Sequence, residues 1–140
     1  MRFVQLHPNF KLPVRSSVEA GGLDVFMPIA GVAKQEKELI GLGFKAAVPK
    51  GHVAFILPRS GVGAKHGIEV TNTVGVIDSD YRNEWFASIK VKPGFPDYKW
   101  EANDRLLQLV IVPVADVTPE LVDELESTDR GEGGFGSTGK

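Results

Sequence analysis

The sequence contains no cysteine, which excludes disulfide bonds and thiolate-bound metal sites. Long apolar runs are also absent. The longest one, residues 106–115, is interrupted by Gln108 and Pro113 and is too short to span a bilayer. The N-terminus alternates polar and apolar residues and lacks the apolar core of a signal peptide. We therefore expect a soluble, cytoplasmic protein with no membrane partner.

An excess of positive charge is missing as well. The chain has 16 Lys and Arg against 18 Asp and Glu, which gives a formal net charge of −2. Such a protein has no basic field to attract nucleic acid, so a few local cations must hold any anionic ligand. The 140 residues suffice for one domain with a hydrophobic core, and 16 Gly and 9 Pro predict many short strands joined by turns.

Apolar and alternating segments predict most of the strands. These are residues 3–7, 23–26, 44–48, 52–57, 85–91 and 105–114. In the segment 85–91, every second residue from Trp85 to Val91 is apolar, which predicts one buried face. Residues 30–40 and 92–104 are predicted to be loops, and 118–126 fits either a helix or a strand.

The densest polar chemistry lies in GVIDSDYRNE, residues 75–84. A short apolar strand brings Asp78 to its end, and Tyr81 follows a turn of small polar residues. The preceding residues 71–75 predict a hairpin. Taken alone, the polar segment is better explained as a β-turn than as a catalytic site, so other segments must decide.

The segment PRSGVGAKHGI, residues 58–68, predicts an anion site or a plain surface helix. Ser60 is a good N-cap for a short helix over 61–66 that Gly67 would end. A helix N-terminus with a serine hydroxyl and the adjacent Arg59 can bind an anion. A capped helix with a surface arginine explains the same residues equally well.

Three further features each allow a structural and a functional interpretation. Asp24 follows two glycines, and it either caps that loop or lies near a ligand or its metal. Gln108 lies in an apolar run, where it is either a satisfied core residue or faces a ligand. The Gly-rich end, residues 129–140, is either a disordered tail or a flap that orders over a ligand.

Five segments, in this order, resemble the five motifs of the trimeric dUTP diphosphatase (dUTPase) family. They are GGLDVF (21–26), PRSGVGAKHGI (58–68), GVIDSDYRNEW (75–85), DRLLQLV (104–110) and RGEGGFGSTG (130–139). The resemblance implies an all-β fold over residues 1–128, a distorted jelly-roll β-barrel with one short helix. It implies that 129–140 is a flexible flap over the active site and that 118–126 is a strand. It also implies a homotrimer with active sites at the subunit interfaces.

Members of the family hydrolyse dUTP to dUMP and pyrophosphate and require Mg²⁺. This reaction limits uracil incorporation into DNA and supplies dUMP for dTMP synthesis. By resemblance, Asp78 activates the water that attacks the α-phosphorus. The residues implied for the base and sugar are Asn72, Thr73, Gly75, Val76, Tyr81 and Phe135. Those implied for the phosphates are Arg59, Ser60, Gly61, Gln108, Arg130, Ser137 and Thr138. The phosphates and waters would hold the Mg²⁺ without a direct protein ligand, and Asp24 would reach it through water.

Two departures and two alternatives accompany the resemblance. Gly21 stands where Ala is common, which has little consequence. Asn83 stands where the family usually has Gly, and Asn tolerates the left-handed conformation better than most residues. A dCTP deaminase shares the fold, but it needs a different acid in place of Asp78 and lacks the full Gly-rich motif. A non-catalytic nucleotide-binding regulator would have lost Asp78, Tyr81 or Arg130, and all three are present.

Overall fold

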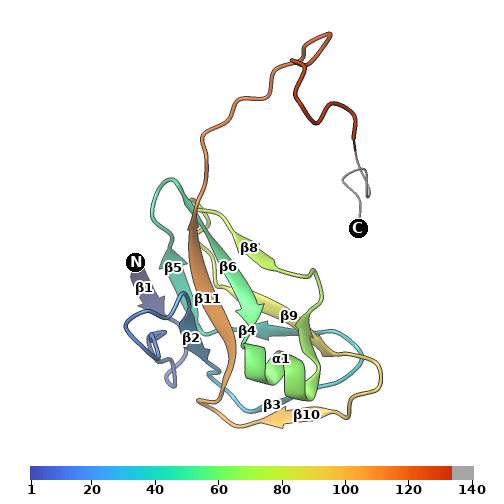
Figure 1. Ribbon diagram of the computed structural model, residues 1–140. Coiled ribbons are helices and arrows are strands. Elements are labelled where there is room, and N and C mark those ends of the chain that lie inside the picture. Colours follow the sequence, from blue (N-terminus) through green and yellow to red (C-terminus); the bar gives the residue numbers. More distant parts are fainter. Residues whose placement is uncertain (134–140) are drawn as a thin grey trace.

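The computed structural model describes residues 1–133, which form short strands and one short helix (Figure 1). The helix is α1 (Ser60–His66). The strands are β1 (Arg2–Gln5), β2 (Leu23–Phe26), β3 (Gly31–Ala33), β4 (Glu38–Gly41), β5 (Phe44–Ala47), β6 (His52–Pro58), β7 (Ile68–Val70), β8 (Gly75–Ile77), β9 (Phe86–Val91), β10 (Tyr98–Trp100) and β11 (Arg105–Pro113).

The strands of the described chain pair into four antiparallel sheets. The largest has the order β2-β11-β6-β8 and the next β4-β9-β7, while β1 pairs with β5 and β10 with β3. This architecture confirms the all-β, jelly-roll-like fold with one short helix. Within residues 1–133, hydrogen bonding does not continue from strand to strand around a closed barrel.

The longest ladder joins β6 to β11 and runs through the middle of the four-stranded sheet (Figure 1). Its register runs from Leu107 opposite Pro58 to Pro113 opposite His52. The apolar run of β11 suits this central position, because both neighbours cover its backbone while alternate side chains enter the core. On the other side of β6, Ile77 of β8 lies opposite Ala54. The end of β8 therefore lies beside the start of β6, whereas α1 begins just after the end of β6.

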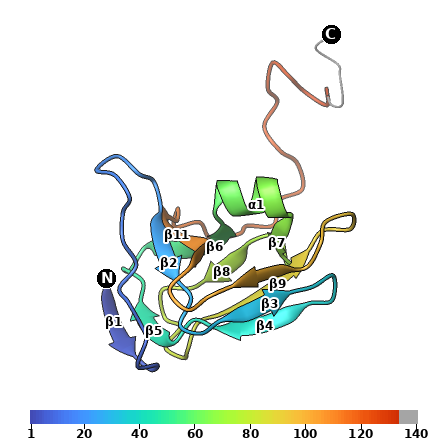
Figure 2. The same ribbon diagram turned by 90° about the horizontal axis from the view of Figure 1, so that it is seen from below.

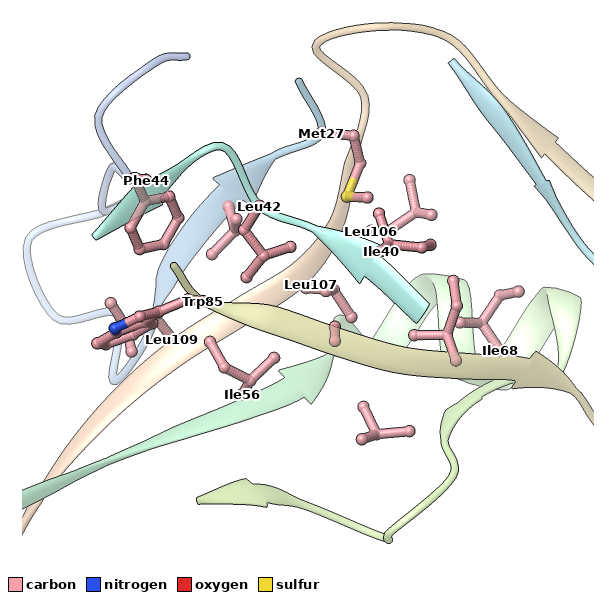
Figure 3. Close-up of a cluster of buried hydrophobic side chains, with 14 of the residues drawn as sticks. Met27, Ile40, Leu42, Phe44, Ile56, Ile68, Trp85, Leu106, Leu107 and Leu109 are labelled. Atoms are coloured by element: carbon pink, nitrogen blue, oxygen red, sulfur yellow. The ribbon is translucent and has the colours of Figure 1, made fainter. Parts of the chain in front are cut away.

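The hydrophobic core contains large side chains from the four-stranded sheet, the three-stranded sheet and β5 (Figure 3). Trp85 and Phe44 are fully buried and lie 5.3 Å apart between ring centroids. The predicted apolar face of 85–91 is confirmed, since Ala87, Ile89 and Val91 are all buried. This packing fixes the strand that follows the polar segment 75–84.

Helix α1 lies beside β6 and β7 and begins one residue earlier than predicted (Figure 2). Arg59 occupies the N-cap position, no side chain caps the helix, and Ser60 is its first residue. The prediction of Ser60 as N-cap is therefore wrong. The predicted end at Gly67 is confirmed, because this residue is left-handed and its N–H bonds to the oxygen of Gly63. No helix of the described residues is long and apolar enough to cross a membrane.

Two segments predicted as loops contain strands. In 30–40, β3 pairs with β10 and β4 pairs with β9, and β10 itself lies in the predicted loop 92–104. Each of these strands is only three or four residues long, so its own sequence shows little periodicity. The partners lie far apart in sequence. Trp100, for example, lies opposite Gly31, where a β-carbon would come within 2.3 Å of the indole ring.

The chain from Val114 onward leaves the body as an arm, which we define as residues 114–133 (Figure 1). It contains neither helix nor strand, so the predicted strand at 118–126 is wrong, as is the helical alternative. The apolar side chains that suggested an element are exposed, with Leu121 at 99% and Leu125 at 89%. No strand among residues 1–133 pairs with this part of the chain, and an unpaired segment cannot form a ladder.

The end of α1 provides a stability test. A β-carbon at Gly67 would lie 2.5 Å from the Phe95 ring, in a backbone with φ of 68°. We expect Gly67→Ala to lower the free energy of unfolding by roughly 2–4 kcal/mol, because backbone strain and overpacking add. Gly51→Ala is the matched control, since its φ is 74° and nothing lies within 4 Å of the added carbon. Denaturant unfolding measures both, and equal losses would contradict the role of Phe95.

Candidate functional site

The predicted site residues of the described chain fall into two groups. The strand-end group surrounds β8 and consists of Asn72, Thr73, Gly75, Val76, Asp78 and Tyr81. The helix-end group surrounds the start of α1 and consists of Asp24, Arg59, Ser60, Gly61 and Gln108. Most of these side chains lie at the surface, and Asp24 is the buried exception, at 8% exposure.

A tight turn connects β7 with β8. The N–H of Thr73 donates to the oxygen of Val70 at 2.9 Å, and that of Val74 donates to the oxygen of Asn72 at 2.7 Å. Thr73 has a positive φ of 69°, which is costly for a β-branched residue. The tight turn agrees with the prediction, but a simple hairpin is wrong, because β7 pairs with β9 and β8 pairs with β6.

Asp78 and Tyr81 close a second turn at the other end of β8. The N–H of Tyr81 donates to the oxygen of Asp78 at 3.2 Å, and the Tyr81 hydroxyl donates to the oxygen of Glu84 at 3.1 Å. Both side chains line a cavity of about 200 Å³ together with Val76, Ile77 and Phe86. The structure thus places a carboxylate and a phenol at one small hollow.

Phe86 is a residue that the sequence reasoning missed. It is 45% exposed and lines both the cavity of Asp78 and a neighbouring one of about 330 Å³ that Asn72 and Gly75 also line. The alternation in 85–91 carried the signal, because it places Phe86 on the outer face of β9. A large aromatic side chain on an exposed face is a candidate ligand contact.

Arg59 and Ser60 lie at the start of α1, where acidic residues are absent from the first turn. The Nε of Arg59 lies 2.8 Å from Oδ1 of Asp24, and its Nη1 donates to the oxygen of Arg105 at 3.1 Å. A cavity of about 440 Å³ joins Arg59 and Ser60 to Thr71 and Thr73 of the turn after β7. Neither Asp78 nor Tyr81 lines this cavity.

Asp78 is remote from Arg59 within one chain. The register places Ile77 opposite Ala54, so Asp78 is level with Val53, and Arg59 lies six residues further along. At about 3.3 Å per residue the separation along the strand is roughly 20 Å. One chain therefore brings the turn threonines, Arg59 and Ser60 together but does not bring Asp78 to them.

Asp24 and Gln108 lie opposite each other on β2 and β11. Gln108 donates from Nε2 to the oxygen of Pro58 at 3.0 Å, so its amide group is at least partly satisfied within the chain. The Oδ2 of Asp24 accepts from Ser16 at 2.8 Å and from Arg105 at 3.1 Å. Asp24 thus holds the loop before β2, as predicted by the interpretation that it caps this loop. It also contacts two arginines.

The resemblance implies that Asp24 contacts Mg²⁺ through a water molecule. Among residues 1–133, no cluster of three or more His, Asp or Glu side chains could hold a metal ion. A carboxylate has about four lone-pair positions, and the described donors Ser16, Arg59 and Arg105 occupy three of them. One position remains for a hydrogen bond, which fits a water on a metal and does not fit a bidentate ligand.

The Gly-rich end is only partly described. Arg130 is exposed in the arm, and its Nε donates to the oxygen of Gly133 at 2.8 Å. Phe135, Ser137 and Thr138 lie outside the described residues. The contacts predicted for these residues therefore remain predictions.

Together, the two groups supply an exposed carboxylate near the start of β6, and an arginine and a serine beyond its end. These are parts that hydrolysis of a phosphoanhydride requires, namely a group that activates water and donors that bind phosphate. The class of protein defined here is thus an all-β protein with the parts of a nucleotide-hydrolysing site.

Comparison with known proteins agrees with this class. A model of the dUTPase family matches residues 8–139, and the chain belongs to that family. It is 39% identical over 138 residues to the deoxyuridine 5'-triphosphate nucleotidohydrolase of Syntrophotalea carbinolica, covering 96% of this chain and 93% of that one. The protein of the same name from Shewanella putrefaciens is 44% identical over 136 residues, covering 94% and 88%.

Solved structures show the same relationship. The dUTPase of Staphylococcus bacteriophage 80alpha with dUPNHPP superposes with a TM-score of 0.86 at 28% identity, covering 99% of this chain and 98% of that one. A mutant dUTPase from phage phi11 of S. aureus, described as coordinating a structural Mg(II) ion, has a TM-score of 0.78 at 25% identity, covering 90% and 98%.

The conformation of Thr73 provides a test. Thr73→Gly removes the left-handed strain, worth about 1–2 kcal/mol, and adds about 0.4–1 kcal/mol of chain entropy to the unfolded state. We therefore expect its free energy of unfolding to stay unchanged or to rise by up to about 1.5 kcal/mol. Thr71→Gly is the control, because it loses the hydroxyl bond to Ser88 at 2.8 Å and should be destabilising. Urea unfolding distinguishes them, and similar losses would contradict strain at Thr73.

Proposed function

We propose that this chain hydrolyses dUTP to dUMP and pyrophosphate, with Asp78 as the base that activates water. The observation that carries the proposal is the turn from Asp78 to Tyr81, which holds an exposed carboxylate and a phenol at one cavity. Membership of the dUTPase family supports the choice of substrate.

Asp78 accepts a proton from a water molecule while the oxygen of that water attacks the α-phosphorus. The bond from the α-phosphorus to its bridging oxygen breaks, and pyrophosphate leaves with the electron pair. Little covalent chemistry falls to the protein, so positioning decides the rate. The hydrogen bonds that fix the Tyr81 backbone and hydroxyl hold Asp78 in a defined turn, which suits that role.

The turn from Val70 to Gly75 selects the base. Asn72 and the nearby backbone, including Thr73, Gly75 and Val76, bind uracil. A backbone N–H facing O4 accepts uracil and rejects cytosine, whose amine is a donor. Discrimination by an unpaired polar group can reach about 10⁴-fold. The two backbone hydrogen bonds within the turn support a site too tight for the methyl group of thymine.

The sugar is selected at the other end of β8. The Tyr81 ring packs against the deoxyribose and leaves no room for a 2'-hydroxyl. Tyr81 is 38% exposed, and the bond from its hydroxyl to the oxygen of Glu84 restrains the ring, which supports a fixed surface for the sugar. Phe135 covers the base from the flap, residues 129–140.

The helix-end group and the flap bind the phosphates. Arg59, Ser60 and Gly61 contact the α- and β-phosphates, and Gln108 reaches them through water. Arg130, Ser137 and Thr138 contact the γ-phosphate. Mg²⁺ neutralises phosphate charge when bound, and it is held by the phosphates and waters rather than by a protein cage. Asp24 has one lone-pair position to accept a hydrogen bond from such a water.

The active protein is a homotrimer in this proposal, with sites shared between copies. The separation of roughly 20 Å between Asp78 and Arg59 supports sharing, because it far exceeds the span of three phosphates. The exposed residues of the arm also support it, since Leu121 and Leu125 are almost fully exposed within one chain. A neighbouring copy that buries them would place the flap over a site that is not its own.

In the cell this activity limits uracil incorporation into DNA and supplies dUMP for dTMP synthesis. A cytoplasmic location remains a prediction.

Substrate choice and the base are tested together. We expect pyrophosphate release from dUTP with Mg²⁺ and little release from dATP, dCTP, dGTP or dTTP. Asp78→Asn should bind dUTP and lose about 10²- to 10⁴-fold in kcat, because it cannot accept the proton. Asp80→Asn is the matched control two residues along, and it should retain activity.

Three outcomes would contradict the proposal. Equal release from all five nucleotides would exclude selection of dUTP. Ammonia from dCTP would indicate the deaminase alternative. Full activity of Asp78→Asn would remove Asp78 as the base.

A further inference from the structure

A β-bulge shapes the start of β11. Arg105 lies opposite Phe26, yet Leu107 lies opposite Val25, so β11 contains one residue more than β2 at this point. The extra residue is Leu106, and it is buried together with Leu107, at 1% and 0% exposure. Regular alternation would place Arg105 on the opposite face from Gln108, and the bulge brings it to the same face.

The bulge thereby directs Arg105 to Asp24. The Nη1 of Arg105 lies 3.1 Å from Oδ2 of Asp24, while the Nε of Arg59 lies 2.8 Å from Oδ1. Arg59 also donates to the backbone oxygen of Arg105 at 3.1 Å. Ser16 completes the cluster by donating to Oδ2 at 2.8 Å. One buried carboxylate therefore fixes two arginines from two different strand ends.

This cluster has a net positive charge, and some of its N–H donors are not used in the described contacts. Two guanidinium groups and one carboxylate leave a net charge of one positive. Each guanidinium has five N–H donors, and the described contacts use two of Arg59 and one of Arg105. The arginine side chains are 33% and 42% exposed, whereas that of Asp24 is 11% exposed. Solvent and anions therefore have more access to the arginines than to the carboxylate.

We propose that Arg105 is a second arginine that binds the triphosphate beside Arg59, and that Asp24 is the positioning residue for both. The inference rests on the proposed function, because it requires substrate phosphates at Arg59. Both guanidinium groups contact one carboxylate, so they are close enough to bind neighbouring phosphates of one chain. Guanidinium groups held in place by a buried carboxylate lose less freedom when they bind phosphate.

The test measures binding of ligands with and without phosphate. We expect Arg105→Gln to weaken a non-hydrolysable dUTP analogue about 10- to 100-fold, the effect of losing a charge-assisted hydrogen bond. Inhibition by deoxyuridine, which has no phosphate, should stay unchanged. Arg105→Lys, which keeps the charge, should bind the analogue with an intermediate affinity. Lys90→Gln is the matched control, because Lys90 pairs with Glu69 at 3.1 Å with similar exposure and should not affect binding.

The positioning role of Asp24 is tested by a double-mutant cycle. Asp24→Asn alone should weaken the analogue and leave deoxyuridine inhibition unchanged. If Asp24 acts through the arginines, the double variant Asp24→Asn/Arg105→Gln should lose less than the product of the two single losses. A loss equal to that product would overturn the positioning role.

The remaining outcomes separate this inference from the proposed function. If wild-type protein hydrolyses dUTP and Arg105→Gln binds the analogue normally, only the inference fails. It also fails if Arg105→Gln weakens the analogue and deoxyuridine equally, or if both arginine variants merely melt earlier with unchanged affinity. If wild-type protein neither hydrolyses dUTP nor binds the analogue, the proposed function fails first and this inference with it.

Discussion

The antiparallel ladder between β6 and β11 is the constraint on which the rest of the structure depends. It lies in the middle of the largest sheet and pairs residues from Pro58 to His52 with Leu107 to Pro113. Burial of side chains such as Leu107, Leu109 and Ile56 stabilises it, at about 1.5–3 kcal/mol for each fully buried side chain. The partly exposed ion pairs at its end contribute about 0–1 kcal/mol each. The core therefore maintains the sheet, and the charged residues are available for binding.

The same ladder keeps Arg59 and Asp78 of one chain far apart. Arg59 directly follows β6, and Asp78 follows β8 near the opposite end of β6. Because β6 is paired with β11 over its whole length, a local rearrangement cannot bring the two residues together. A site that uses both must then combine different copies of the chain. The exposed arm is consistent with such an assembly, since residues 114–133 extend away from their own body (Figure 1).

The sequence correctly predicted features of the fold that depend on residues close together in the chain. The alternation in 85–91 predicted the buried face of β9, and the Gly67 C-cap predicted the end of α1, because each depends on neighbouring residues. The strands β3 and β10 could not be predicted, since each exists only because a distant partner satisfies its backbone. The strand predicted at 118–126 in the arm was wrong because its apolar residues have no partner within residues 1–133. Arg105 was missed because the bulge at Leu106 reverses the face that simple alternation gives it.

Mixing two inactive variants tests most directly whether the site is shared between copies. Asp78→Asn lacks the base and Arg59→Gln lacks the phosphate arginine, so each alone should be nearly inactive. Unfolding them together and refolding them at equal concentrations allows mixed assemblies to form. A site shared between two copies predicts recovery of about a quarter of wild-type activity, because random pairing restores both residues in that fraction of the sites. Activity no greater than that of the separate variants, in assemblies shown to be mixed, would contradict the shared site.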